Sequence, residues 1–358
     1  MIELLHRWYY RYFSDPQAVL LTLILVLGTT VILTMGNMLA PALAAIVIAY
    51  LLEGIVRYLE KAKVKRLGAV LFVFSLFSAF VIFLLFGVIP LISIQITALI
   101  KELPQHLTVA QNALMALPEH YSFISEQNVK EFSTLLNNEI ASLGQHILSV
   151  SLASVGSFVT VLVYLVLVPL LVFFFLKDKA LITSWFSGFL PRDRQAASQV
   201  WHEMDAQLGN YVRGKFWEIL IVGSVSFVAF SILGLKYSIL MAVIVGLSVI
   251  VPYIGATVVT LPIIVVGYFQ WGWGSEFAVL MIVYGIIQAL DGNVLVPLLF
   301  SSVVNLHPIS IIVSILVFGG LWGFWGVFFA IPLATLVNAV VAAWPKVKAA
   351  PPQEEPIA

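Results

Sequence analysis

The sequence predicts an all-α polytopic membrane protein with about eight hydrophobic helical elements, including two re-entrant helical hairpins in the C-terminal half. Hydrophobic residues make up 61% of the 358 residues, charged residues only 10%, and the mean hydropathy is +1.05. Soluble domains carry about 25% charged residues, so these values indicate a chain that lies largely in lipid. The sequence has no cysteine, which excludes disulfides, thiolate metal sites and a cysteine nucleophile.

The first part of the chain, residues 1–92, is predicted to hold an interfacial segment and three membrane helices. Residues 1–16 are rich in Arg, Trp and Tyr, which favour the boundary between lipid headgroups and water. A cleaved signal peptide is the alternative, but a second apolar run follows too closely for one. Gly36 and Asn37 predict a tight turn, and Pro90 is expected to close the third helix. The three helices are expected at residues 18–35, 38–52 and 67–92.

The middle of the chain alternates between two polar regions and one membrane helix. The first polar region holds two basic and five acidic residues, with breaks expected at Pro104 and Pro118. Apolar residues recur at helical spacing over 129–147 and predict an amphipathic extramembrane helix. Its partner would be the membrane surface, the rest of the protomer or a neighbouring subunit. The predicted regions are an amphipathic extramembrane region at residues 93–150, a membrane helix at 151–176 and a basic amphipathic region at 177–216.

The distribution of basic residues predicts the orientation in the membrane. Four segments contain 15 of the 18 Lys and Arg residues, and cytoplasmic loops of membrane proteins are enriched in Lys and Arg. We therefore expect both termini, including the tail at 345–358, to be cytoplasmic and residues 93–150 to be periplasmic. The four basic segments are residues 7–11, 53–66, 177–216 and 346–348.

The C-terminal part, residues 217–344, is predicted to be the transport core. After a span near 217–235, four apolar arms flank two glycine-bearing tips, VPYIGA and GFWGV. Three arms have about 14–16 residues and reach only about 21–24 Å at 1.5 Å per residue, less than the roughly 30 Å hydrocarbon core. We therefore predict two re-entrant hairpins with one crossing between them near 277–300. The arms are residues 238–251, 255–270, 308–322 and 324–343.

The two predicted hairpins resemble each other. At an offset of 71 residues, Gly255 aligns with Gly326 and Leu235 with Leu306. One crossing between the hairpins would insert the first from outside and the second from inside, the inverted arrangement of many secondary transporters. The site is then expected where the two tips meet. A chance alignment of low-complexity apolar sequence is the alternative.

The candidate binding site centres on Asp291, the only acidic residue between Glu276 and Glu354. A charge that follows an apolar run must be solvated by protein or water, so we predict that it binds a cation, a proton or a polar ligand. The alternative is that the polar residues of this region lie in loops, and that His307 caps a helix. The predicted substrate- or ion-binding residues are Asp291, Gln288, Asn293, Asn305 and His307. The predicted hairpin or hinge residues are Pro252, Gly255, Pro297, Pro308, Gly319, Gly323, Gly326 and Pro332.

Several motifs resemble the autoinducer-2 exporter family. They are VPYIGA (251–256), QALDGNVLVP (288–297), NLHP (305–308) and GGLWGFWGVFFAIPLA (319–334). The segments WYYRYFSDP (8–16), LVPLLVFFFLKDK (167–179) and YVRGK (211–215) are similar to the PerM-type permease branch of this family. The resemblance implies a bacterial inner-membrane protein, a homo-oligomer with a pentamer as one option, that moves small solutes or ions.

The predicted activity is transport of a small solute such as autoinducer-2, driven by an ion gradient. Sodium or lithium/proton antiport and a non-transporting membrane scaffold are the alternatives. No phosphate-binding P-loop, HExxH or GxSxG motif occurs, so we expect no enzyme activity, ATP motor, cofactor or metal centre. The expected partners are the lipid bilayer, the solute or a monovalent cation or proton, and other copies of the chain, but no nucleic acid.

Overall fold

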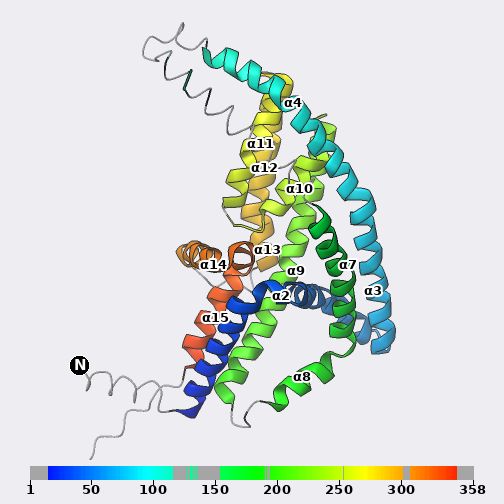
Figure 1. Cartoon of the computed structure of the whole chain (residues 1–358), viewed down its shortest axis with the longest axis vertical. Coiled ribbons are helices and arrows are strands. Elements are labelled where there is room, and N and C mark those ends of the chain that lie inside the picture. The colour runs from blue at the N-terminus through cyan, green and yellow to red at the C-terminus, as the bar shows by residue number, and fades with distance from the viewer. Residues whose placement is uncertain are drawn as a thin grey trace, which may run out of the picture. The chain divides into compact units, whose positions relative to one another are not determined.

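The described part of the chain consists of helices joined by short connections, as the composition predicts (Figure 1). The computed structural model describes residues 15–115, 127, 130, 131, 134, 154–189, 191, 194–252, 254–300 and 307–344, and no strand occurs among them. Seven helices in these residues are long and apolar enough to cross a membrane, or eight if one sharply bent pair counts as a span. The predicted fold class, an all-α polytopic membrane protein, is therefore confirmed. The amphipathic stripe predicted over 129–147 lies largely outside the described residues.

The first two predicted membrane helices form one continuous helix, α2 (Pro16–Lys61). The predicted tight turn is wrong, because Gly36 and Asn37 are both helical. A glycine costs a helix only about 1 kcal/mol, whereas backbone groups left unpaired in lipid cost several kcal/mol each. The helix instead changes direction part-way along its length (Figure 1). Its two parts, Pro16–Gly36 and Met38–Lys61, are each long and apolar enough to cross a membrane.

The third predicted membrane helix also continues further than expected. Helix α3 (Arg66–Phe83), the π-helical segment η1 (Leu84–Val88) and helix α4 (Ile89–Met115) follow one another without a break. The predicted end at Pro90 and the predicted break at Pro104 are therefore wrong. A proline inside a helix removes one hydrogen bond but does not always interrupt the chain's helical path.

A π-helical segment lies two residues before a proline at two places in the described chain. Segment η1 ends at Val88 and is followed by Pro90, and segment η2 (Asp291–Leu295) is followed by Pro297. A proline ring clashes with the carbonyl four residues before it, and in both cases that carbonyl belongs to the π segment. The wider turn of a π segment relieves such crowding, because it carries one extra residue. At Pro297 the structure thus has a widened turn within a continuing helix.

The next two helices meet at a sharp bend. Helix α7 (Ser154–Lys177) covers most of the membrane helix predicted over 151–176, and the short helix α8 (Lys179–Gly188) follows it. The axes of Val161–Lys177 and α8 differ by 80°. Helix α8 was not anticipated from the sequence, which indicated only a basic amphipathic region there.

Helix α9 (Gln195–Ile232) joins the predicted basic amphipathic region to the following membrane span without a break. Its 38 residues extend over about 57 Å, almost twice the roughly 30 Å thickness of the hydrocarbon core. In its first half, Val200 and Tyr211 are buried while Trp201 is exposed. One continuous helix therefore joins the predicted basic region to a segment that is apolar enough to cross a membrane.

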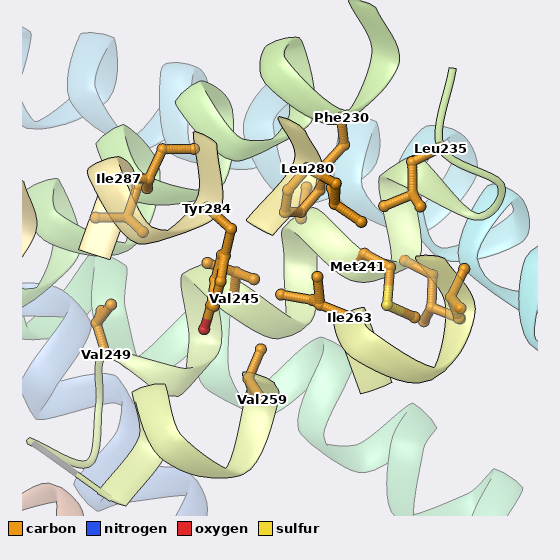
Figure 2. Close-up of a cluster of buried hydrophobic side chains, with 14 residues drawn as sticks. Phe230, Leu235, Met241, Val245, Val249, Val259, Ile263, Leu280, Tyr284 and Ile287 are labelled. Carbon is orange, nitrogen blue, oxygen red and sulfur yellow. The ribbon is translucent and has the colours of Figure 1, made fainter. Parts of the chain in front are cut away.

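The chain divides into two compact units, and the division falls within α9. Unit 1 comprises Met1–Val70, Leu171–Trp217 and Val296–Ala358, and unit 2 comprises Leu71–Leu170 and Glu218–Leu295. In unit 1, a small apolar cluster joins α2, α9 and α15 (Ala330–Ala343). Unit 2 holds a larger apolar core, to which α9, α10 (Ser238–Ser248), α11 (Ile254–Trp271) and α12 (Ser275–Leu290) each contribute buried side chains (Figure 2).

The arms predicted in the C-terminal part correspond to observed helices. Helices α10 and α11 match the arms of the first hairpin and pack together in the core of unit 2. In the second, α14 (Pro308–Phe328) has a non-helical backbone at Gly323 (φ 59°, ψ −135°), between the two predicted arms, and Phe329 separates the end of α14 from α15. That these helix pairs re-enter the membrane stays a prediction.

A buried carboxylate holds three helices of unit 1 together. Glu53 in α2 is only 6% exposed, and its carboxylate lies 3.4 Å from Arg57 Nε, 3.4 Å from Arg66 Nη2 and 3.2 Å from Lys179 Nζ. Arg66 also donates a hydrogen bond of 2.5 Å to the carbonyl of Leu176, at the end of α7. The cluster therefore ties α2 to the start of α3 and to the bend between α7 and α8.

We expect Glu53→Gln to lower the stability of unit 1. Removing one partner of a buried ion cluster costs several kcal/mol, but the three cations are partly exposed, so the expected loss is about 1–2 kcal/mol. Thermal unfolding of the purified protein in detergent measures the effect. Glu60→Gln is the matched control, because Glu60 is partly exposed and, among the described residues, pairs with Arg66 alone, at 3.2 Å. Equal melting temperatures for both variants would contradict a central role for Glu53.

Candidate functional site

Asp291 lies inside an apolar helical span. The span Ser275–Phe300 has 26 residues and consists of α12, the π segment η2 and helix α13 (Val296–Phe300). At 1.5 Å per residue it is about 39 Å long, and Asp291 is about 24 Å from its start. With the span centred on a hydrocarbon core of roughly 30 Å, Asp291 falls within that core. A carboxylate at such a depth is expensive and marks a functional site by default.

The π segment that begins at Asp291 gives this position an unusual backbone. In a π turn the amide bonds to a carbonyl five residues back, so the regular pairing four residues back is locally lost. Asn293 compensates with its side chain, whose Nδ2 donates to the carbonyl of Ala289 at 2.8 Å. Single π turns inside α-helices occur frequently at functional sites. The side-chain amide of Asn293 thus supports the backbone here.

Three polar side chains follow one face of this helix. Tyr284, Gln288 and Asp291 are spaced by four and three residues, which places them on the same side. The buried hydroxyl of Tyr284 donates to the carbonyl of Ala256 and lies 3.1 Å from Thr260 Oγ1. Gln288 lies beside this hydroxyl, and Gln288 Nε2 and Asp291 Oδ1 are both shielded from solvent. The polar face of this helix therefore extends from Tyr284, which contacts α11, to the carboxylate of Asp291.

The aromatic ring of Tyr284 anchors this face in the core of unit 2. Figure 2 shows the ring extending from α12 toward Val245 of α10 and Val259 of α11. Its hydroxyl therefore meets α11 within the first turns after the tip of the first hairpin. A displacement of that tip would move the hydrogen-bond partners of Tyr284.

The tip of the first hairpin is built on a close backbone approach. The amide of Gly255 donates to the carbonyl of Val251 at 2.9 Å. A Cβ atom at Gly255 would overlap the carbonyl of Ser248, the last residue of α10. Only glycine allows the two backbones to approach so closely, so the return of the chain into α11 depends on this residue.

The second hairpin is built in the same way. A Cβ atom at Gly326 would overlap the carbonyl of Phe318, eight residues earlier. Between them Gly323 has a positive φ of 59°, a conformation that favours glycine. Gly255 and Gly326 are the two glycines that the 71-residue alignment pairs, and the structure gives both the same role.

The remaining predicted binding residues have other positions. His307 is exposed and caps α14, because its Nδ1 accepts a hydrogen bond from the amide of Ile309 at 3.3 Å. This agrees with the helix-cap alternative. Asn305 lies outside the described residues. The structure therefore brings Gln288 and Asp291 together in unit 2, and His307 belongs to unit 1.

The remaining predicted hinge residues lie at helix ends or close contacts. Pro308 is the first residue of α14, and Pro252 lies in the connection between α10 and α11. Gly319 packs against the side chain of Val327, and Pro332 is buried near the start of α15.

Sequence reasoning missed a buried polar cluster in α9. Tyr211 is fully buried, and its hydroxyl donates to the carbonyl of Phe328 at 2.9 Å. Lys215 is also buried, and its Nζ lies 5.1 Å from the centre of the Phe300 ring, a cation–π contact. A Cβ atom at Gly214 would collide with the same ring. The signal in the sequence is the YVRGK motif at 211–215, in which Tyr, Arg and Lys come directly before an apolar run.

Tyr284 and Thr260 were also missed. Both are hydroxyl residues inside apolar runs, and Tyr284 comes seven residues before Asp291. That spacing is two helical turns, so a search along the face of Asp291 would have found it.

Comparison with known proteins gives a consistent result. The family model described as AI-2E family transporter matches residues 20–346. The chain is 46% identical to "Putative permease PerM" of Escherichia coli K12 over 346 residues, 96% of this chain and 98% of the relative. It is 28% identical to "Putative transport protein YueF" of Bacillus subtilis, over 84% of this chain and 82% of the relative. A "Putative transport protein" of Thermotoga maritima is 22% identical, over 90% of this chain and 92% of the relative.

Proposed function

Because the chain belongs to the AI-2E transporter family, we propose that it exports a small solute such as autoinducer-2 across the bacterial inner membrane. The relatives are named as permeases and transport proteins, which supports a transport role for this multi-pass membrane protein. The chain has no ATP-binding motif of the P-loop type, so we propose that an ion gradient drives the export.

The observation that carries this proposal is the position of Asp291 in the apolar span Ser275–Phe300. Removal from water favours the neutral form of a carboxyl group, whereas a bound cation favours its charged form. Protons and cations therefore compete for such a group. This competition is a physical basis for coupling an ion gradient to the movement of a solute.

The two glycine tips supply the second part of the proposal. Broken helices in secondary transporters place ligand sites where half-helices meet near the middle of the membrane. We propose that the tip at Gly255, in unit 2, borders such a site, and the tip at Gly326 repeats the same close backbone approach. Tyr284 would then connect the first tip to the face that carries Gln288 and Asp291, through its hydrogen bond to Ala256.

Sodium or lithium/proton antiport is the second candidate function, and the same carboxylate favours it. In that case the cation itself is the transported species. Flux measurements with the purified protein in proteoliposomes distinguish the two. Proton-gradient-driven movement of autoinducer-2 supports export, whereas sodium- or lithium-dependent proton movement without solute flux supports antiport. The absence of either flux would favour the non-transporting scaffold and would overturn the proposal.

The proposed orientation has both termini in the cytoplasm. We expect a membrane-impermeant maleimide added to intact cells to label Gln127→Cys and not Gln199→Cys. Both side chains are exposed, and they belong to the acidic region and the basic region respectively, so the positive-inside rule places them on opposite sides. The absence of native cysteines removes background labelling. Labelling of Gln199→Cys alone would reverse the orientation.

The proposed assembly is a homo-oligomer, with a pentamer as one option. Mass measurement of the purified protein in lipid nanodiscs tests it, since a monomer of 39.4 kDa is easily distinguished from its multiples.

A further inference from the structure

Helix α8 exposes an apolar face that the rest of the described chain does not cover. Four large side chains of α8 and its C-cap are between 60% and 71% exposed, namely those of Leu181, Trp185, Phe186 and Phe189. The rings of Phe186 and Phe189 lie 4.9 Å and 4.7 Å from that of Trp185, edge to face. The four side chains thus form one continuous aromatic and apolar surface.

The opposite face of α8 is polar. Each residue turns an α-helix by about 100°, so Leu181, Trp185 and Phe189 lie within about 80° of one another. Thr183, Ser184 and Ser187 lie on the other side, and their hydroxyls donate back to helix carbonyls at 2.8–3.1 Å. A short helix with this division of side chains is typical of segments that lie in the plane of a membrane interface.

The position of α8 in the chain agrees with a membrane interface. It follows Val161–Lys177, the apolar half of a bent pair, and turns by 80° from it. A helix that leaves a membrane-spanning segment at nearly a right angle runs along the membrane surface. Tryptophan is also the residue most enriched at this depth of the bilayer, together with tyrosine.

A basic rim lies beside the start of α8. Lys61, the last residue of α2, and Lys63 and Lys65, in the connection between α2 and α3, are all exposed. This connection is held close to α8 by the ion pair between Lys179 and Glu53 at 3.2 Å and by the hydrogen bond from Arg66 to the Leu176 carbonyl. Residues 53–66 and 177–179 together contain seven basic and three acidic residues. The local charge is therefore positive and complements anionic lipid headgroups.

We propose that α8 lies in the headgroup region of the bilayer, with its apolar face among the acyl chains and the rim of Lys61, Lys63 and Lys65 bound to anionic lipids. The aromatic side chains give the depth of insertion, and the lysines give the preference for lipid type. This site is independent of the proposed transport activity. It would fix the end of α7 and the Glu53 cluster relative to the membrane surface.

Spin labels on the two faces of α8 test the insertion. The full-length protein is reconstituted into vesicles of phosphatidylcholine and phosphatidylglycerol, with the label at Phe186→Cys or, as the matched control, at Ser184→Cys. These positions are about 160° apart around the helix. We expect molecular oxygen, which concentrates in lipid, to relax the label at position 186 more than a water-soluble nickel complex does, and the reverse at position 184.

Two other outcomes would overturn the insertion. Strong relaxation of the label at position 186 by the nickel complex would show that the apolar face is in water. Weak relaxation by both reagents would show that protein covers this face, as it would in contact with a second copy of the chain or another protein.

A fluorophore at Phe186→Cys tests the lipid preference. We expect brominated phosphatidylglycerol to quench it more strongly than brominated phosphatidylcholine at equal mole fraction, and the preference to be lost in Lys61→Gln/Lys63→Gln/Lys65→Gln. The triple variant of Lys101, Lys130 and Lys236 to Gln has the same change in net charge and should retain the preference. Equal quenching by both lipids in the protein with its native lysines would contradict binding of anionic lipid at the basic rim. So would a loss of the preference for phosphatidylglycerol that is equal in both triple variants.

Discussion

Asp291→Asn is expected to abolish gradient-driven flux while the protein still inserts and assembles. The substitution keeps the size and hydrogen-bonding capacity of the side chain but removes its charge and its titration. Beyond the first turn of α12, Asp291 is the only acidic residue in the span Ser275–Phe300. No other acid on that helix can therefore replace it. The flux in proteoliposomes should fall to that of protein-free vesicles at every pH.

Two further variants sharpen this test. Glu276→Gln removes an exposed acid at the start of the same helix and should leave flux unchanged. Asp291→Glu retains a carboxyl group at this position and should keep a pH-dependent flux. If Asp291→Asn retained flux with the native pH dependence, Asp291 would be structural and the coupling site would have to lie elsewhere.

The second large effect is expected from alanine at the hairpin tips. In Gly255→Ala and Gly326→Ala the new Cβ overlaps a backbone carbonyl, of Ser248 or Phe318, and no side-chain rotation relieves the overlap. Overpacking of this kind costs about 1–3 kcal/mol or more, and here it forces the two arms of a hairpin apart. We expect both variants to lose flux, because both tips have the same construction.

Matched glycines without close neighbours provide the control. A Cβ atom at Gly320, in the same hairpin as Gly326, meets no atom within 4 Å, and the same is true of Gly285 in α12. Gly320→Ala and Gly285→Ala should therefore retain flux and a native melting temperature. Full activity of Gly255→Ala and Gly326→Ala, at normal expression, would show that the tips have room and would remove the hairpin model.

The hairpin arms and Asp291 could be predicted from the sequence, because they depend on the length of the apolar runs and on the residues that end them. The bounds of α10, α11 and the arms beside Gly323 were close to those observed, because Gly255, Pro308 and Gly323 each act through local backbone geometry. The carboxylate was found for a similar reason, since one charge in an apolar run is conspicuous whatever the packing. Local rules therefore sufficed for the hairpin arms and for Asp291.

Other features depend on the tertiary structure and the cost of free backbone groups in lipid. Gly36 and Pro90 are turn signals in water, but the helix continues through both, because an interruption inside the membrane would leave amides unpaired. The π turn at Asp291 and the hydrogen bond from Tyr284 to Ala256 could not be read from periodicity. Helix α8 was missed because its ten residues are too few for a clear period.

The π segment before Pro297 has a consequence for the rotational phase of its helix. One extra residue in a turn rotates everything beyond it by about 100° around the helix axis. The widened turn accommodates the ring of Pro297, so this proline favours one rotational phase for the residues that follow. Pro297→Ala would remove this preference, and the accessibility of a cysteine introduced at Leu298 would report the rotation. One proline therefore influences the rotational phase of the short helix α13 that follows the π segment.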